Sequence, residues 1–250
     1  MFGIALRYGI SLDELRTANP TVNPNFLSIG TNLVIPDPLT PMPSTAQPTA
    51  TPVPVAFGPL DCARSADGGA WCFQPVQNTQ DFALESVRAI FRLTDAGAQQ
   101  IIPQQAFLPL DVLPAGTTLP LYAYFPPESI AALSGPLAGS SELQGALPHR
   151  EDGRYLAVEL TNQKAAIRAD GLSAQVSADA SLMQEADDPA SRLWIAAIAF
   201  DAQGRVTGVR RWEMPEGTTL EQGKSLPVAF DLYSTAGSIE RVELIAEARP

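Results

Sequence analysis

The chain has 250 residues, of which 45% are hydrophobic and 17% charged, and its formal net charge is −11. The apolar fraction excludes global disorder, and the acidic charge argues against a nucleic-acid partner, which requires a basic surface. No apolar run approaches the 18 residues of a membrane-spanning helix. One histidine and two cysteines are too few for a His/Cys metal cluster, so we expect neither a metal nor a cofactor.

Short helices and turns are expected at the start of the chain. Residues 2–8 form an apolar run that ends at Gly9, a suitable left-handed helix end. Residues 11–14 have the Ser-x-x-Glu pattern of a helix capping box, and Asn19-Pro20 ends this second helix. Residues 33–35 are predicted to form a short strand.

The order and spacing of these residues are specific. The pattern consists of Phe2-Gly3-Ile4-Ala5, Tyr8-Gly9-Ile10-Ser11, Leu15, Ala18-Asn19-Pro20, Leu27, Gly30 and Leu33-Val34-Ile35-Pro36. It resembles a LysM module, a small βααβ domain, over residues 1–36. The family usually opens with a strand and a Gly-Asp-Thr-Leu turn, whereas this chain begins about where that turn ends. We therefore expect a module that lacks its first strand, with the missing strand and a signal or anchor encoded upstream of Met1.

The LysM resemblance implies a ligand and a site. Modules of this family bind N-acetylglucosamine polymers such as peptidoglycan or chitin in a groove, and their second loop forms one wall. Carried over to this chain, the wall consists of Asn19, Pro20, Thr21, Leu27 and Ile29. The module is also neutral in net charge, which suits a neutral sugar.

Residues 37–59 are rich in Pro and Thr, a composition that predicts an extended, semi-rigid linker. Cys62 and Cys72 follow it. Their spacing is too wide for a typical zinc pair, so we predict a local disulfide, the alternative being two buried free thiols. A disulfide implies an oxidising compartment and hence an extracellular or cell-surface protein.

A weak internal repeat organises the rest of the chain. Each copy has a strand, an Asp turn and a later Leu-Pro pair that precedes another strand. These features lie at residues 87–93, Asp95 and Leu119-Pro120 in the first copy, and at residues 194–200, Asp201 and Leu226-Pro227 in the second. Short strands at such spacing are typical of antiparallel sandwiches. We predict a mostly β protein whose two tandem Ig-like β-sandwich domains span residues 60–168 and 169–250.

The first copy also has a second family resemblance. Residues 75–79, 84–89 and 92–95 are similar to FxLYD-type surface domains, with Thr94 where that family has Tyr. The resemblance implies an Ig-like sandwich of unknown activity.

The candidate catalytic groups are few. His149 lies in a polar connection and is expected to be solvated, and no Gly-x-Ser-x-Gly motif accompanies it. The adjacent pairs Asp187-Asp188 and Glu151-Asp152 lie in turns, where neighbouring carboxylates do not face each other across a cleft. Trp71 is expected to pack against the cysteine bridge, Trp194 to be core, and Trp212 to be core or partly exposed. We therefore expect no catalytic residue and no enzyme activity.

These observations predict a non-catalytic cell-envelope protein in which a LysM module tethers two β-sandwiches to an N-acetylglucosamine polymer. The alternative is a secreted partner-binding or hydrolase-accessory protein. Its β-sandwiches would bind another protein through an exposed strand edge.

Overall fold

The computed structural model describes residues 12–19, 22, 32–35, 51–95, 101–150, 152–183 and 188–250. The chain divides into two compact units, Met1–Thr49 and Ala50–Pro250. Among the described residues of the first unit there is one helix, α2 (Leu12–Thr17), whose Leu15 is fully buried. The helix predicted over residues 2–8 lies outside the described residues. No helix in the described part of the chain is long and apolar enough to cross a membrane.

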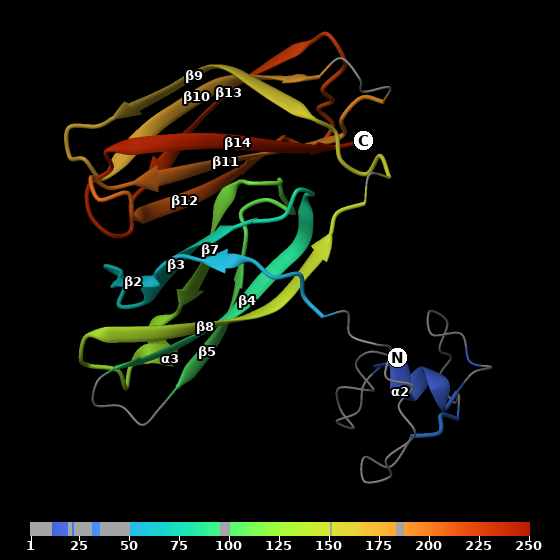
Figure 1. Cartoon of the computed structure of the whole chain (residues 1–250), viewed down its shortest axis with the longest axis vertical. Helices are drawn as coiled ribbons and strands as arrows, with labels where there is room; N and C mark the ends of the chain where they lie inside the picture. Colours follow the sequence, from blue (N-terminus) through green and yellow to red (C-terminus); the bar gives the residue numbers. More distant parts are fainter. Residues whose placement is uncertain are drawn as a thin grey trace. The chain divides into compact units, whose positions relative to one another are not determined.

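The unit Ala50–Pro250, which we call the β-module, is built almost entirely of antiparallel strands (Figure 1). Its one described helix is the single turn α3 (Pro127–Ile130). The strands are β1 (Ala56–Phe57), β2 (Asp61–Arg64), β3 (Ala70–Gln77), β4 (Leu84–Asp95), β5 (Ile102–Phe107), β6 (Val112–Leu113), β7 (Thr118–Phe125), β8 (Leu137–Pro148), β9 (Val158–Ile167), β10 (Ser173–Leu182), β11 (Arg192–Phe200), β12 (Val206–Glu213), β13 (Ser225–Tyr233) and β14 (Arg241–Arg249). The prediction of a mostly β protein is confirmed.

Strands β1 to β8, the first β-unit, belong to one sheet of eight strands. Its order is β1-β3-β7-β5-β4-β6, with β2 added to β3 and β8 added to β4. Strands β5 and β7 are joined only at the pair of Phe107 and Tyr122. Alternate residues of β3, β4 and β7 enclose the core, with Phe91 and Phe125 fully buried.

Strands β9 to β14, the second β-unit, form two facing sheets of three strands, β13-β10-β9 and β12-β11-β14. Alternation on β10 is strict: Val176, Ala178 and Ala180 are buried, while the residues between them are more exposed. This period of two is that of a strand with one face against a core. The inner residues meet Leu193, Ile195 and other apolar residues of the facing sheet.

The internal repeat is visible as repeated topology. In the first β-unit β3 pairs with β7, and β4 pairs with both β5 and β8. In the second, β10 pairs with β13, and β11 pairs with both β12 and β14. Strand β2 stands beside β3 as β9 stands beside β10. The two copies therefore share one arrangement of six strands, which supports the predicted duplication.

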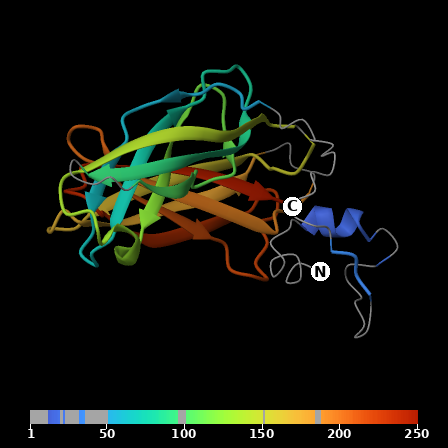
Figure 2. The same ribbon diagram turned by 90° about the horizontal axis from the view of Figure 1, so that it is seen from below.

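The central strand of the second β-unit is buried on both faces. From residue 193 to residue 199, every side chain of β11 is buried. Leu193 and Ile195 face the sheet β13-β10-β9, whereas Ile198 joins the core of the first β-unit and Trp194 contacts Leu110. A continuous apolar run is the pattern of a strand covered on both sides. At right angles to the first view, the strands of one β-unit lie over those of the other (Figure 2).

The strand pairing differs from two predicted boundaries. The linker was predicted to reach residue 59, but β1 pairs with β3 and the N–H of Val53 donates to Ala146 O at 2.9 Å. Val53 and Val55 pack on the core, because alternating Val and Pro residues suit an edge strand. The boundary predicted between residues 168 and 169 falls inside the β9–β10 hairpin, so the division between the β-units precedes β9.

Candidate functional site

In the first unit, Asn19 joins the end of helix α2 to the segment of residues 32–35. Its side-chain Nδ2 donates to Leu15 O and to Val34 O, both at 2.7 Å, and its Oδ1 accepts from the N–H of Val34 at 2.7 Å. The residue is only 6% exposed. A side-chain amide that both donates to and accepts from one residue substitutes for a peptide group of a neighbouring strand. Asn19 therefore links the end of helix α2 to the backbone of Val34 through hydrogen bonds.

The segment of residues 33–35 was predicted to be a strand and is not assigned as one. A strand needs a partner backbone, and Val34 instead pairs with the Asn19 side chain. The side chain of Val34 is 63% exposed, so this contact is made by its main chain alone. The sequence shows an Asn at the end of the helix and an apolar triplet later in the chain. Neither feature indicates that Asn19 pairs with Val34.

Of the predicted sugar-binding wall, the structure describes only Asn19, whose amide is occupied by contacts within the unit. The remaining members of the wall lie outside the described residues, so the wall stays a prediction; they are Pro20, Thr21, Leu27 and Ile29.

The disulfide predicted in the β-module is present. Cys62 and Cys72 are directly opposite each other on β2 and β3, with a Cα–Cα distance of 4.1 Å. Cys72 faces the core and is fully buried. Trp71, predicted to pack against this bridge, points to the other face of β3 because neighbouring residues of a strand alternate.

Three tryptophans were predicted to lie mainly in the core, and each contacts other aromatic or cationic groups. Trp71 is partly exposed and lies 4.9 Å from the ring of Tyr124. Trp194 is 7% exposed and has the guanidinium groups of Arg211 and Arg249 over its ring. Trp212 is partly exposed, and its ring centroid lies 6.5 Å from a Phe ring of the second β-unit.

His149 was expected to be solvated, and the structure corrects this. Its side chain is only 14% exposed, because the ring lies edge-on against Tyr155 at 5.1 Å. The Nδ1 atom is 3.1 Å from a carboxylate oxygen of Glu85, which also pairs with Arg154 at 3.0 Å. The long connection after β8 therefore packs against β4, and no local sequence pattern predicts this contact.

The turn pairs of carboxylates have structural partners where they are described. Asp152 pairs with the guanidinium of Arg154 at 2.7 Å, which lowers the pKa of its carboxyl. Asp188 is exposed, and the two other members, Glu151 and Asp187, lie outside the described residues. Among the described residues, no group of three or more His, Cys, Asp or Glu side chains is placed to hold a metal ion.

The junction between the two β-units contains a buried carboxylate. Glu247 on β14 is 6% exposed, and its Oε2 accepts hydrogen bonds from the backbone N–H groups of Asp111 at 2.9 Å and Val112 at 2.8 Å. Burial raises the pKa of this carboxyl from 4.5 to about 7. Arg249, two residues further, pairs with Asp111 and donates to the hydroxyl of Tyr155 at 2.7 Å.

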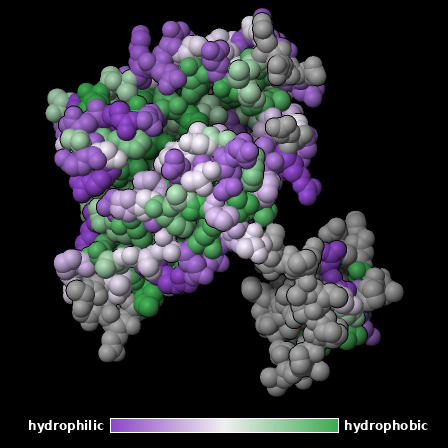
Figure 3. Space-filling view, in the orientation of Figure 1, coloured by the Kyte–Doolittle hydropathy of each residue, from purple (hydrophilic) through white to green (hydrophobic). Residues whose placement is uncertain are grey.

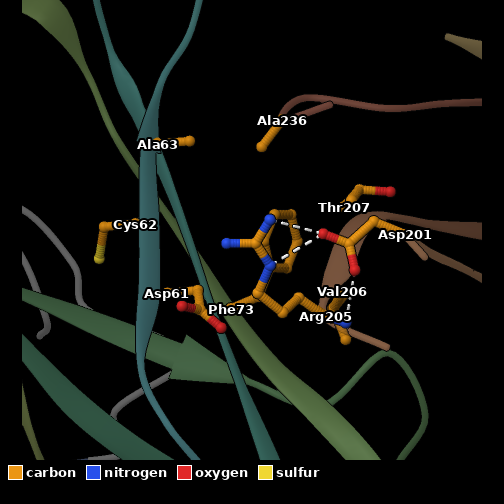
Figure 4. A pocket seen from close by; sticks show the side chains of 9 residues that line it. All are labelled: Asp61, Cys62, Ala63, Phe73, Asp201, Arg205, Val206, Thr207 and Ala236. Atoms are coloured by element: carbon orange, nitrogen blue, oxygen red, sulfur yellow. Dashed lines mark hydrogen bonds and ion pairs between the residues drawn. The ribbon is translucent and has the colours of Figure 1, made fainter. Parts of the chain in front are cut away.

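A small pocket of about 130 Å³ opens at another part of the same junction (Figure 4). Strands β2 and β3 contribute Asp61 and Phe73, and the turn between β11 and β12 contributes Asp201 and Arg205. Arg205 and Asp201 pair at 2.8 Å, and Asp201 also accepts backbone hydrogen bonds from the turn. The charges of Asp201 and Arg205 are therefore satisfied by each other and by the turn.

Comparisons with known proteins agree with the first of these sites. The family model described as "LysM domain" matches residues 1–36. The chain therefore carries a LysM segment, which indicates binding of N-acetylglucosamine-containing polymers.

The comparisons say little about the β-module. No curated protein matches the chain. A crystal structure of red sea bream transglutaminase is similar over 79% of this chain and 29% of its own length, with 8% identity and a TM-score of 0.25. The chain thus spans less than a third of that protein, and a likeness this weak carries no argument about function.

Proposed function

We propose that this protein is a non-catalytic, exported component of a cell envelope. Its LysM segment binds an N-acetylglucosamine polymer, such as peptidoglycan or chitin, and holds the β-module on that polymer. The LysM match over residues 1–36 is the observation that carries the proposal. The disulfide Cys62–Cys72 supports an oxidising, extracellular location.

Tethering is the mechanism that the architecture favours. The β-module has its own core and a junction whose central strand is covered on both faces, so it can act as one rigid body. A weak sugar site gains from being linked to other modules, because linkage raises the effective concentration of each at the surface. The described carboxylates Asp152 and Glu247 hold structural contacts, which favours a non-catalytic role.

Sedimentation with purified peptidoglycan and with chitin tests this proposal. The whole chain is expected to sediment with at least one polymer and to be released by soluble N-acetylglucosamine oligomers. Residues 50–250 alone are expected to stay in the supernatant. Failure of the whole chain to sediment, or equal sedimentation of residues 50–250, would contradict the proposal.

A matched pair of variants locates the site. Leu27→Ser changes a residue of the predicted wall, and Val34→Ser changes an apolar side chain that is 63% exposed and contacts Asn19 only through its backbone. We expect the first variant to lose sedimentation and the second to keep it. Equal binding by both variants would show that the wall is assigned to the wrong residues.

The alternative function is protein binding by an edge of the β-module. Strand β9 is an edge of the sheet β13-β10-β9, and residues 161–167 are all exposed. Edge strands accept added strands through their free backbone groups, although Lys164 is of the kind that discourages such pairing. A partner bound in this way would slow hydrogen exchange of the outward amides of β9. Binding that leaves those amides unchanged would exclude this route.

A further inference from the structure

A pocket of about 350 Å³ lies between the two β-units, is lined by residues of the β-module alone, and shares no lining residue with the pocket of Figure 4. Its walls come from β4, from the end of β5 and the residues after it, from the segment before β9, and from the end of β14. The lining residues are Ser86, Val87, Arg88, Phe107, Leu108, Leu110, Asp111, Arg154, Tyr155 and Arg249. Ligand sites favour such junctions, and this volume is within their usual range.

Strand β4 is irregular where it lines the pocket. Its register with β8 shifts between Glu85 and Arg88 and again after Arg88. Ser86, inside this bulge, has a φ of 57°, a left-handed conformation that is uncommon for residues other than glycine. Bulges re-aim side chains and are frequent beside functional sites. Here the bulge precedes Arg88, which faces the pocket.

Arg88 is the centre of a row across three strands. It is directly opposite Phe107 on β5 and Gly145 on β8. A Cβ at Gly145 would lie 2.9 Å from Ser86 O and 3.4 Å from the Cζ of Arg88, so the glycine accommodates the bulged backbone of β4 beside Arg88. Phe107 is 49% exposed and supplies an apolar surface next to this cation.

One of the three arginines that line the pocket has no carboxylate partner among the described residues. Arg249 is paired with Asp111, and Arg154 is paired with Asp152 and Glu85. Within the described part of the chain, Arg88 has no carboxylate partner, although the protein as a whole carries a net charge of −11. A single guanidinium without a partner suits a monoanion better than a phosphate dianion, and its fork matches a carboxylate.

The wall that carries the apolar lining is held in place by the rest of the protein. Glu247 accepts hydrogen bonds from the backbone of Asp111 and Val112, and the buried Leu110 packs on Trp194. A wall fixed in this way does not have to be ordered when a ligand arrives, which lowers the entropic cost of binding.

We infer that this pocket binds a small monocarboxylate that carries an apolar or aromatic group. The carboxylate pairs with Arg88, and the apolar group lies against Phe107, Leu108 and Leu110. The same chemistry is available from a free organic acid and from the carboxyl end of a peptide. The inference does not depend on sugar binding by the LysM segment.

Isothermal titration of the whole chain with 4-phenylbutyrate and with N-acetyl-Ala-Ala-Phe tests this inference, with the amide of each acid as the neutral control. At least one acid is expected to bind, and its amide at least tenfold more weakly, because the charge-assisted hydrogen bond is lost. The tighter of the two acids identifies the source of the carboxylate. Absence of binding by both acids, or equal binding of an acid and its amide, would overturn the inference.

Two pairs of variants test which residues contact the ligand. Arg88→Gln is expected to weaken acid binding at least tenfold, while Arg92→Gln, on the same strand but paired with Glu142, leaves it unchanged. Phe107→Ala is expected to weaken binding severalfold, while Ile101→Ala, which removes a side chain that is 62% exposed, does not. Equal affinities for Arg88→Gln and the wild-type protein would show that the acid binds elsewhere and would refute the site.

Discussion

Replacement of Glu247 by Gln tests whether the junction of the two β-units is sensitive to pH. The Glu247 carboxyl accepts two backbone hydrogen bonds through Oε2, while its buried Oε1 has no hydrogen-bond partner. Asp111 raises the pKa of this carboxyl and Arg249 lowers it, but burial dominates, and the pKa rises from 4.5 to about 7. The folded protein therefore binds this proton more tightly than the unfolded chain does.

The sign and size of the effect follow from linkage between protonation and folding. A carboxyl with a raised pKa contributes stability that is complete below pH 4.5 and is lost as the pH rises through about 7. With about 1.4 kcal/mol per pKa unit, the loss amounts to roughly 3 kcal/mol. Asp67, whose pKa is lowered to about 2 by hydrogen bonds from Ser65 and Tyr124, titrates below this window.

Urea unfolding, followed by tryptophan fluorescence at intervals from pH 4.5 to pH 8, measures the effect. The free energy of unfolding of the wild-type protein is expected to contain a component that falls across this range and is absent in Glu247→Gln. A constant offset between the two proteins is expected as well, because the Gln amide leaves a buried donor without a partner. The diagnostic quantity is therefore the slope with pH.

The control is Glu243→Gln on the same strand. Glu243 is paired with Arg241, and its side chain is 55% exposed. This variant should follow the pH dependence of the wild-type protein. Parallel curves for the wild-type protein and Glu247→Gln would refute the reasoning, because the buried carboxyl would then not titrate in the stated window.

Three further changes probe packing and covalent structure through the urea midpoint. Gly208→Ala is expected to destabilise the protein by about 1–3 kcal/mol, because its Cβ would lie 2.3 Å from Tyr233 O; an unchanged midpoint would contradict this. Asn78→Ala is expected to cost about 2–3 kcal/mol, since the fully buried amide donates to three backbone carbonyls; a loss below about 0.5 kcal/mol would argue against that role. Replacing both Cys62 and Cys72 by Ala should cost about 3 kcal/mol, and denatured, unreduced wild-type protein should show no titratable thiol; two thiols would refute the bridge.

The predictions that rest on short sequence patterns agree with the structure and with the family comparison. The order of residues across 1–36 predicted the LysM segment, and the spacing of Cys62 and Cys72 predicted their bridge. The matching Asp turns and Leu-Pro pairs predicted a repeat that the strand pairing supports. Each of these signals is contained in a short stretch, or in the comparison of two short stretches.

The candidate sites depend on contacts that no short stretch contains. The hydrogen bond from Asp111 to Glu247 joins residues 136 positions apart, and the pocket beside Arg88 needs four separate segments of the chain. The sequence predicted a solvated His149, because its partner, Glu85, is 64 positions away and no local pattern indicates the pairing. The pairing of Asn19 with Val34 likewise joins residues 15 positions apart and cannot be recognised without the fold.

The sequence by itself determined the class of each segment: a LysM segment, a proline-rich connection, a disulfide and a duplicated set of strands. Only the tertiary structure decided that the two β-units share a junction in which β11 is covered on both faces and Glu247 is buried. The physical reason is that the alternation of apolar and polar residues along a strand predicts which side chains are buried. It does not predict which distant part of the chain packs against them.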